Sequence, residues 1–236
     1  MINQHLLGEP AEINYLLEDI KEEYNEGIKL LLKRNNSFLF DNPHKIPKLE
    51  KIQINRSLGL SAQNTNILKT NVEEFITITG QKPIITKAKK AIAGFKIREN
   101  MELGLCVTLR GKKMYAFLTK LIFFTFPQIR DFRGLSVRSF DKSGNYTIGF
   151  KEQLIFPELD YDDITQIQGF NVTFVISSSL PKTKTTYKLI NGIVLFKFLR
   201  FPLVDSGYYK KYSELPEMTE MWDKKKHLRR KRWSQE

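Results

Sequence analysis

The chain has 236 residues, one cysteine and a formal net charge of +12. This length suffices for one domain of ordinary size with a buried core. The single cysteine excludes an internal disulfide and a thiolate-rich zinc site, and no apolar run reaches the roughly 18–20 residues of a membrane span. Between residues 82 and 151 there are fifteen Lys and Arg but four carboxylates. This concentration of positive charge indicates a polyanion, and it favours nucleic acid over a membrane because no basic amphipathic helix stands out.

The first 46 residues predict an acidic helical extension and a linker. Apolar residues recur at helical spacing over residues 10–34, and residues 35–46 are rich in turn formers. This region has neither the apolar stretch of a secretory signal nor the Arg- and Ser-rich start of an import presequence. We therefore expect the protein to work in the compartment where it is made. Residues 47–202 should form the main domain, and residues 203–236 a basic C-terminal tail.

Hydrophobic patterning predicts four strands and three helices within the main domain. Alternating apolar residues place strands at 48–55, 103–109, 145–151 and 170–176. Helical spacing covers residues 64–79, 111–126 and 183–201, with Gly80 as a helix end. The expected fold class is α+β, an antiparallel sheet with helices packed on one face, two long basic loops and N- and C-terminal extensions.

One face of this sheet is predicted to be small and polar. The residues concerned are Gln53, Asn55, Thr108, Asn145, Thr147, Asn171 and Thr173. An antiparallel sheet can simply leave such a face to water, and the pattern alone gives the two interpretations about equal weight. Short hydrogen-bonding side chains flanked by cations suit an RNA minor groove, which is recognised by its shape and 2′-hydroxyls. The face has no aromatic residue, which argues against base stacking.

Catalytic patterns are poor. The three histidines lie in the extension, the linker and the tail, which disfavours a histidine-based acid–base or metal site. The acidic stretch 157–163 lacks the spacing of a calcium loop and is better explained as a solvated connection. Residues 110–113 either bind phosphate at a helix start or form a turn with exposed lysines, and the two are equally supported. We expect no enzymatic activity, metal or cofactor.

The two basic loops differ in composition. Residues 81–98 carry mainly lysines around Gly94. Residues 128–153 carry Arg130, Arg133, Arg138 and Lys142 among turn formers, interleaved with Phe132, Leu135, Val137 and Phe140. Disordered segments are poor in such apolar residues, so the second loop should be ordered.

Several long stretches resemble the bacterial-type ribosomal protein L5 family. They include PKLEKIQIN, ITGQKPIITKAKKAIAGFKIRENMELGLCVTLRGKKMYAFLTKLI and PQIRDFRGLSVRSFDKSGNYTIGFKEQLIFPELDYD. The resemblance covers about residues 47–176 and extends more loosely to residue 202. It implies an α+β protein associated with 5S rRNA in the central protuberance of the large ribosomal subunit.

The resemblance also implies roles for particular residues. Combined with the polar face, it predicts an rRNA-binding surface formed by Gln53, Asn55, Arg56, Ser57, Gly59, Thr108, Asn145 and Thr147. It implies a loop that contacts P-site tRNA, with Lys87, Lys89, Lys90, Gly94, Phe95, Lys96 and Arg98. It assigns a bridge to the small-subunit head and its protein S-thirteen, with Arg130, Arg133, Arg138 and Lys142. Large-subunit rRNA and neighbouring central-protuberance proteins are the other expected partners, and no membrane is expected.

The sequence departs from the family after Asn55. Where the family usually has Asn-Met-Gly-Val-Gly-Glu, this chain reads Asn55-Arg56-Ser57-Leu58-Gly59-Leu60. Terminal extensions, an Asn-, Lys- and Ile-rich composition and the missing presequence favour a mitochondrially encoded protein of the mitochondrial ribosome, with a bacterial cytoplasm second. The expected function is a structural constituent of the large subunit in translation. The alternatives are a free RNA chaperone or assembly factor using the same surface, and, less favoured, an RNA-directed enzyme.

Overall fold

The computed structural model describes residues 47–159, 161, 164, 166–177 and 185–204. The chain divides into two compact units, one comprising Met1–Phe132 and Ser139–Phe201 and the other Arg133–Arg138 and Pro202–Glu236. The expected N-terminal helix and most of the basic tail lie outside the described residues. The domain boundaries at 46 and 202 therefore remain predictions.

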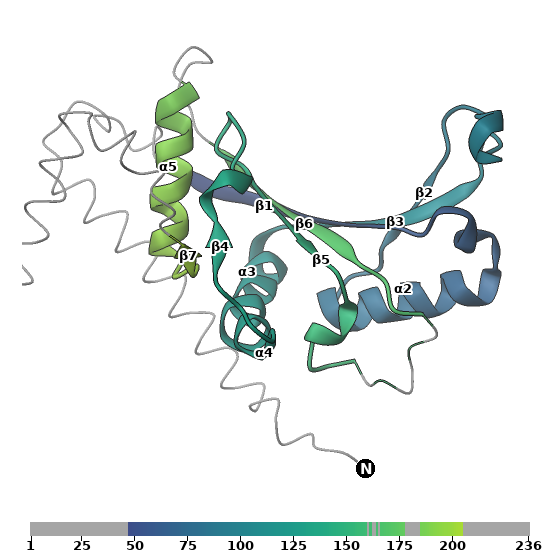
Figure 1. Ribbon diagram of the computed structural model, residues 1–236, viewed down its shortest axis with the longest axis horizontal. Coiled ribbons are helices and arrows are strands. Elements are labelled where there is room, and N and C mark those ends of the chain that lie inside the picture. Colours follow the sequence, from purple (N-terminus) through teal and green to yellow (C-terminus); the bar gives the residue numbers. More distant parts are fainter. Residues whose placement is uncertain (1–46, 160, 162–163, 165, 178–184, 205–236) are drawn as a thin grey trace, which may run out of the picture. The chain divides into compact units, whose positions relative to one another are not determined.

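The larger unit is built on a five-stranded antiparallel sheet with the strand order β2-β3-β1-β6-β5 (Figure 1). The strands are β1 (Lys48–Ser57), β2 (Ile84–Lys87), β3 (Glu102–Leu109), β5 (Tyr146–Phe150) and β6 (Phe170–Ser177). In β1 and β6 buried apolar residues alternate with more exposed residues, which is the pattern of a sheet with one covered face. Four strands were predicted. The fifth, β2, lies in the stretch that we expected to be entirely loop.

Helices cover the apolar face of this sheet (Figure 1). They are α2 (Thr65–Thr79), α3 (Gly111–Lys120), the three-residue α4 (Phe126–Gln128) and α5 (Thr185–Phe198). Phe75 of α2 packs edge-on against Phe170 of β6, and Phe196 of α5 packs against Phe174 of the same strand. Because residues 170 and 174 point to the same side of a strand, α2 and α5 lie on one face. The α+β architecture predicted from the sequence is confirmed.

Local signals account for the helix ends. The side chain of Asn64 caps α2 by accepting a hydrogen bond from the backbone N–H of Asn66, and Gly80 ends the helix in the left-handed conformation with φ 63°. Residues 111–126 do not form one uniform helix as predicted, because a π-helical turn (Leu121–Thr125) separates α3 from α4. Pro127 lies in the first turn of α4, where its missing N–H is tolerated.

Short 3-10 turns connect the larger elements. They are η2 (Gly59–Gln63), η3 (Ala93–Phe95), η5 (Val137–Ser139) and η6 (Gln153–Ile155). In the second unit, β4 (Leu135–Ser136) pairs in parallel with β7 (Leu203–Val204). Among the described residues, no helix is long and apolar enough to cross a membrane.

Candidate nucleic-acid interface

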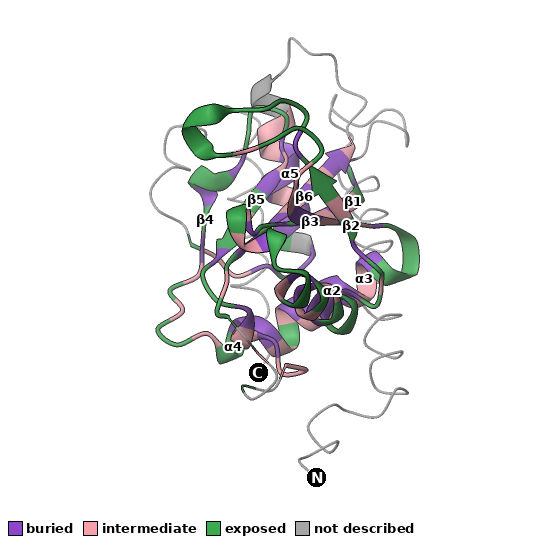
Figure 2. Ribbon diagram, turned by 90° about the vertical axis from the view of Figure 1, so that its right-hand side faces the viewer, coloured by how far each residue is buried: buried purple, intermediate pink, exposed green. Residues whose placement is uncertain are grey.

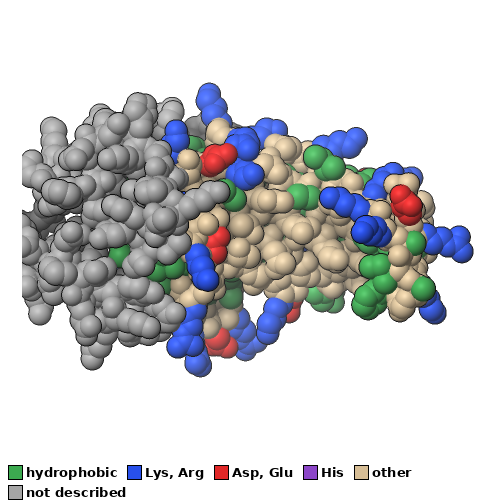
Figure 3. All heavy atoms as spheres, turned by 90° about the horizontal axis from the view of Figure 1, so that it is seen from above, with side chains coloured by type: hydrophobic (Ala, Val, Ile, Leu, Met, Phe, Trp, Pro, Cys, Tyr) green, Lys and Arg blue, Asp and Glu red, His purple; other side chains and the backbone are tan. Residues whose placement is uncertain are grey.

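The uncovered face of the sheet carries two rows of short polar side chains across neighbouring strands. In the first row, Gln53 on β1 lies between Thr108 on β3 and Thr173 on β6, and Thr173 is paired with Thr147 on β5. In the second row, Asn55 lies between Cys106 and Asn171. The strand register thus brings the predicted polar residues of β1, β3, β5 and β6 together on one surface. Seen from this side, much of the surface is uncharged and polar (Figure 3).

Two amides on this face are available to a ligand. Asn55 and Asn171 are both exposed, and neither side chain has a hydrogen-bond partner among the described residues. Elsewhere on the face, the Thr147 and Thr173 hydroxyls lie 3.2 Å apart, and the Gln53 amide lies 3.5 Å from the Cys106 sulfur. A free amide offers both donors and an acceptor, which 2′-hydroxyls and base edges can complement.

Asn145 does not offer its side chain in the same way. Its Oδ1 accepts a hydrogen bond from the backbone N–H of Ile176 at 3.0 Å, and its Nδ2 donates to Asp141 at 2.9 Å. These bonds fix the loop before β5 and leave little capacity for RNA. The structure therefore gives Asn145 a structural role beside the polar face.

Arg56 is not part of the exposed surface, contrary to our expectation. It has the same strand parity as Ile52 and Ile54, so its side chain points into the core and is fully buried. Its Nη1 donates to Asn71 Oδ1 and to Glu74 Oε2, both at 2.6 Å. Burial lowers the pKa of Arg56, and its hydrogen bond to Glu74 and the Glu74 charge oppose that shift. A guanidinium enclosed in this way does not contact RNA.

The residues after Arg56 remain at the edge of the polar face. Ser57 is exposed, and Gly59 adopts a left-handed φ of 59° where the 3-10 turn η2 begins. That conformation explains a glycine at this position. Gln81 was not among the predicted rRNA-binding residues. Its side-chain amide donates to the Thr108 carbonyl at 3.1 Å, which places it beside the first polar row. The only feature of the sequence that could have pointed to Gln81 is its position directly after Gly80, which ends the helix.

The predicted tRNA-contact loop is a structured hairpin. Beyond β2 the backbone N–H of Ala88 donates to Met101, and a bridge between Ile92 and Ile97 closes the tip. The turn Ala93–Phe95 forms this tip, and Phe95 is 69% exposed. The ribbon of this hairpin tip is coloured as exposed in Figure 2. Five exposed cations accompany it: Lys87, Lys89, Lys90, Lys96 and Arg98. Lys87 pairs with Glu102 at 3.5 Å, whereas the other four have no ion pair among the described residues.

The four cations of the predicted bridge fall in both units. Arg130 and Lys142 belong to the larger unit, Arg133 and Arg138 to the second, and all four are exposed. Apolar residues interleaved with them are anchored: Phe132 stacks on Phe126 with ring centroids 5.2 Å apart, and Phe140 packs on Tyr146 at 4.6 Å. Leu135 and Val137 are buried. The apolar residues of this loop are thus packed in both units, as expected for an ordered loop.

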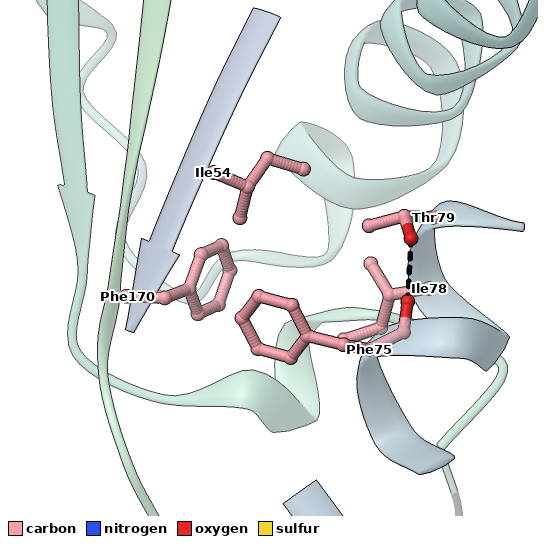
Figure 4. Close-up of a pocket in the computed structure, with 5 residues that line it drawn as sticks. All are labelled: Ile54, Phe75, Ile78, Thr79 and Phe170. Atoms are coloured by element: carbon pink, nitrogen blue, oxygen red, sulfur yellow. Dashed lines mark hydrogen bonds between the residues drawn. The ribbon is translucent and has the colours of Figure 1, made fainter. Parts of the chain in front are cut away.

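No feature of the described residues forms a reaction centre. They contain no cluster of three or more His, Cys, Asp or Glu that could hold a metal ion. A small pocket in the larger unit is lined by Ile54, Phe75, Ile78, Thr79 and Phe170 (Figure 4). Its one polar side chain, Thr79, already donates its hydroxyl to the Phe75 carbonyl at 2.6 Å. The pocket is therefore a packing gap in the core.

A wide polar sheet face beside a cationic hairpin is the kind of surface found on structural proteins of ribonucleoprotein particles. The family model described as "Ribosomal protein L5" matches residues 42–98, and the model that describes the C-terminus of the same ribosomal family matches residues 102–198. The chain belongs to the ribosomal protein L5 family. Proteins of this family are structural constituents of the ribosome and not enzymes, which confirms the expected lack of enzymatic activity.

Relatives that match the whole chain are named as chloroplast forms. "Large ribosomal subunit protein uL5c" of Trieres chinensis is 73% identical, and that of Phaeodactylum tricornutum is 66% identical, each over the full length of both chains. "Large ribosomal subunit protein uL5" of Rippkaea orientalis is 52% identical over 67% of this chain and 87% of its own. The expected mitochondrial location is therefore wrong, because these names point to the plastid. An Asn-, Lys- and Ile-rich composition is common to proteins encoded in either organelle and could not separate the two.

Proposed function

We propose that the protein is a structural constituent of the large subunit of a plastid ribosome and docks rRNA, including 5S rRNA, through the polar face of its sheet. The observation that carries this proposal is the pair of exposed, unpartnered amides on Asn55 and Asn171, within a surface of short polar side chains. Base-edge and 2′-hydroxyl contacts need groups that both donate and accept. Flanking lysines add the salt-dependent attraction to phosphates that RNA binding requires.

The proposal is tested by mapping the RNA contact directly. Large subunits carrying the full-length protein, with a photoreactive group at Asn55 or Asn171, should yield crosslinks to rRNA. The same group at Lys69, an exposed residue on α2, should not. Crosslinks from Lys69 with none from the sheet face would reject docking through this surface.

The hairpin between β2 and β3 is proposed to contact the P-site tRNA. Its exposed lysines supply reversible phosphate contacts, and a tRNA that leaves in every cycle cannot be held rigidly. The free lysines are Lys89, Lys90 and Lys96, since Lys87 is engaged by Glu102. Phe95 at the tip adds exposed apolar surface for a base or ribose.

We expect Lys90→Glu with Lys96→Glu to raise the dissociation rate of P-site tRNA by about 30-fold or more. Each reversal replaces an attraction worth about 0.5–1 kcal/mol by a repulsion, and about 1.4 kcal/mol corresponds to a factor of ten. The measurement is tRNA release from ribosomes assembled with the variant protein, whose incorporation should be normal. The matched control is Lys69→Glu with Lys151→Glu, which makes the same charge change at two exposed positions elsewhere. Equal release rates in both variants would refute the hairpin contact.

The bridge to the small subunit is proposed to involve Arg130, Arg133, Arg138 and Lys142. The supporting observation is that exposed cations alternate with anchored apolar residues, so the segment presents charge from a fixed backbone. Protein S-thirteen and the RNA of the small-subunit head are the expected partners, and neighbouring central-protuberance proteins are expected to contact other surfaces.

A further inference from the structure

The turn before β5 presents Lys142, one of the four cations of the proposed bridge. The turn runs from Asp141 to Asn145, and both residues at its tip, Lys142 and Ser143, are exposed. Lys142 forms no ion pair among the described residues, although Asp141 is its neighbour in the chain. The turn therefore offers a free cation on a short stretch of backbone.

The carboxylate of Asp141 holds the backbone of this turn. Its Oδ1 accepts hydrogen bonds from the backbone N–H groups of Ser143 at 2.8 Å and Asn145 at 2.7 Å. The backbone N–H of Gly144 donates to the Asp141 carbonyl at 3.1 Å, and that of Asp141 donates to the Asn145 carbonyl at 2.9 Å. An aspartate that accepts from the backbone after it is a common way to stabilise a turn. Because the carboxylate is directed at the backbone, it does not pair with Lys142.

The side chain of Asn145 connects the turn to the sheet. Its Nδ2 donates to Asp141 Oδ2 at 2.9 Å, and its Oδ1 accepts from the backbone N–H of Ile176, near the end of β6, at 3.0 Å. One amide therefore joins the turn, its aspartate and a neighbouring strand. The loss of this side chain would release the turn from β6 without removing any charge.

Helix α5 supports the turn from below. Lys188, Gly192 and Phe196 follow one another at intervals of four residues, so they lie along one side of the helix. A Cβ on Gly192 would lie 2.5 Å from the Gly144 carbonyl oxygen. A Cβ on Gly144, whose φ is 86°, would lie 2.5 Å from the Lys188 carbonyl oxygen. The helix and the turn thus touch backbone to backbone, which requires glycine at both positions.

Aromatic packing holds both ends of the turn on the same side of α5. The ring centre of Phe196 lies 5.2 Å from that of Phe140, directly before the turn, and 5.0 Å from that of Tyr146, directly after it. All three side chains are buried. The middle of the turn contacts Gly192 and its ends contact Phe196, so the turn cannot shift unless α5 shifts with it.

We propose that Asn145 and Gly192 are positioning residues of the bridge, which fix the turn so that Lys142 meets an anionic group of the small-subunit head. A backbone that is already ordered loses less conformational entropy on binding, so each contact that it presents contributes more to affinity. This inference rests on the proposed bridge and adds two residues to it. It also gives Asn145, which was predicted to bind rRNA, a role at a different surface.

The test measures, by light scattering, the association of natural small subunits with large subunits that contain full-length variants. Lys142→Ala should weaken association about two- to fivefold, the effect of losing one exposed charge contact. Asn145→Ala and Gly192→Ala keep this charge and should cause a loss of the same size or smaller. Neither should weaken association further when combined with Lys142→Ala, because a positioning residue acts only through Lys142. The affinity of the free Asn145→Ala protein for large-subunit rRNA should not change.

Two control variants belong to α2 and its end, outside the proposed rRNA, tRNA and bridge surfaces. Lys69→Ala removes an exposed cation, and Gly80→Ala strains the backbone at a φ of 63° with open space around it. Both should associate as the natural protein does. Asn145→Ala leaves the contact between Gly144 and Gly192 intact, so it decides the question if Gly192→Ala prevents incorporation into large subunits.

The outcomes separate the inference from the proposed bridge. If Lys142→Ala has no effect, Lys142 is not a bridge contact, and both proposals fail at this residue. If Lys142→Ala weakens association but Asn145→Ala and Gly192→Ala do not, the bridge stands and the positioning role is wrong. An equal loss from Gly192→Ala with and without Lys142 would indicate a general packing defect and overturn the inference. A lower rRNA affinity of Asn145→Ala, with unchanged association, would return Asn145 to the rRNA surface.

Discussion

Arg56→Ala is expected to lower the free energy of unfolding by about 3–5 kcal/mol, because it leaves the buried Glu74 carboxylate without its charged partner and opens a cavity. The guanidinium lies 4.7 Å from the ring centre of Phe75 and 5.9 Å from that of Phe170. The Arg56 side chain therefore contacts both α2 and β6 from β1. It lies in the core, where water cannot take over these contacts after the substitution. A loss of this size is a large fraction of the stability of a typical domain.

A double variant separates the ion pair from the packing. Arg56→Met with Glu74→Met replaces both charges by apolar side chains of similar length, and we expect it to unfold within about 1 kcal/mol of the natural protein. Arg56 Nε, Arg56 Nη2 and Glu74 Oε1 have no hydrogen-bond partner among the described residues, so the natural pair is incompletely satisfied.

Urea unfolding of Arg56→Met, of Glu74→Met and of the double variant completes the cycle. A double variant as unstable as Arg56→Ala would show that the charges themselves hold this part of the core. Arg56→Ala should also weaken rRNA docking, since Asn55 and Ser57 flank it on the same strand. The double variant should recover that docking along with its stability.

Arg56 also shows where reasoning from sequence fails. The family resemblance put Arg56 among the rRNA contacts, whereas its even position in β1, shared with Ile52 and Ile54, places its side chain on the core side. The structure follows the parity, because a strand cannot turn one side chain to the other face without a bulge. The partner that makes this burial tolerable, Glu74, lies 18 residues away in α2 and no local pattern identifies it.

The large-scale architecture could be predicted because its signals are local and repeated. Alternation gave β1, β3, β5 and β6, and Gly80 correctly marked the end of α2. Strand β2 was missed because its Ile-Ile-Thr core lies within a run of lysines that dominated the interpretation. The pairing of β4 with β7 connects two-residue strands 68 positions apart, from Leu135 to Leu203, and has no sequence signature.

The sequence predicted which residues form the polar face, but not which of their side chains are free to bind a ligand. Strand parity placed Gln53, Asn55, Thr108 and Thr147 on one surface, as the register now shows. Which amides are free depends on tertiary hydrogen bonds. Asn145 and Asn171 look alike in sequence, yet the first is engaged by Asp141 and Ile176 while the second is exposed without a partner among the described residues.

The free amides of Asn55 and Asn171 lead to the second prediction with a large expected effect, which concerns rRNA docking. Asn55→Ala with Asn171→Ala should weaken binding of the protein to its rRNA by about 30-fold or more. Each amide contributes hydrogen bonds worth about 1–1.5 kcal/mol, and the RNA groups left without partners add to the loss. Neither side chain has an intramolecular bond among the described residues, so folding stability should change little. The measurement is the dissociation constant of the full-length protein for large-subunit rRNA at fixed salt.

The matched control replaces two exposed amides outside the polar face, Asn66→Ala with Gln128→Ala, and should bind rRNA as the natural protein does. The salt dependence gives a further check. Neutral amides do not displace counterions from the RNA phosphates. The slope of affinity against salt concentration should therefore stay the same in the Asn55 and Asn171 variant. If the affinity of the Asn55 and Asn171 variant equals that of its control, the sheet face is not the docking surface. RNA binding would then have to rest on the cationic loops alone, with a correspondingly steep salt dependence and little sequence preference.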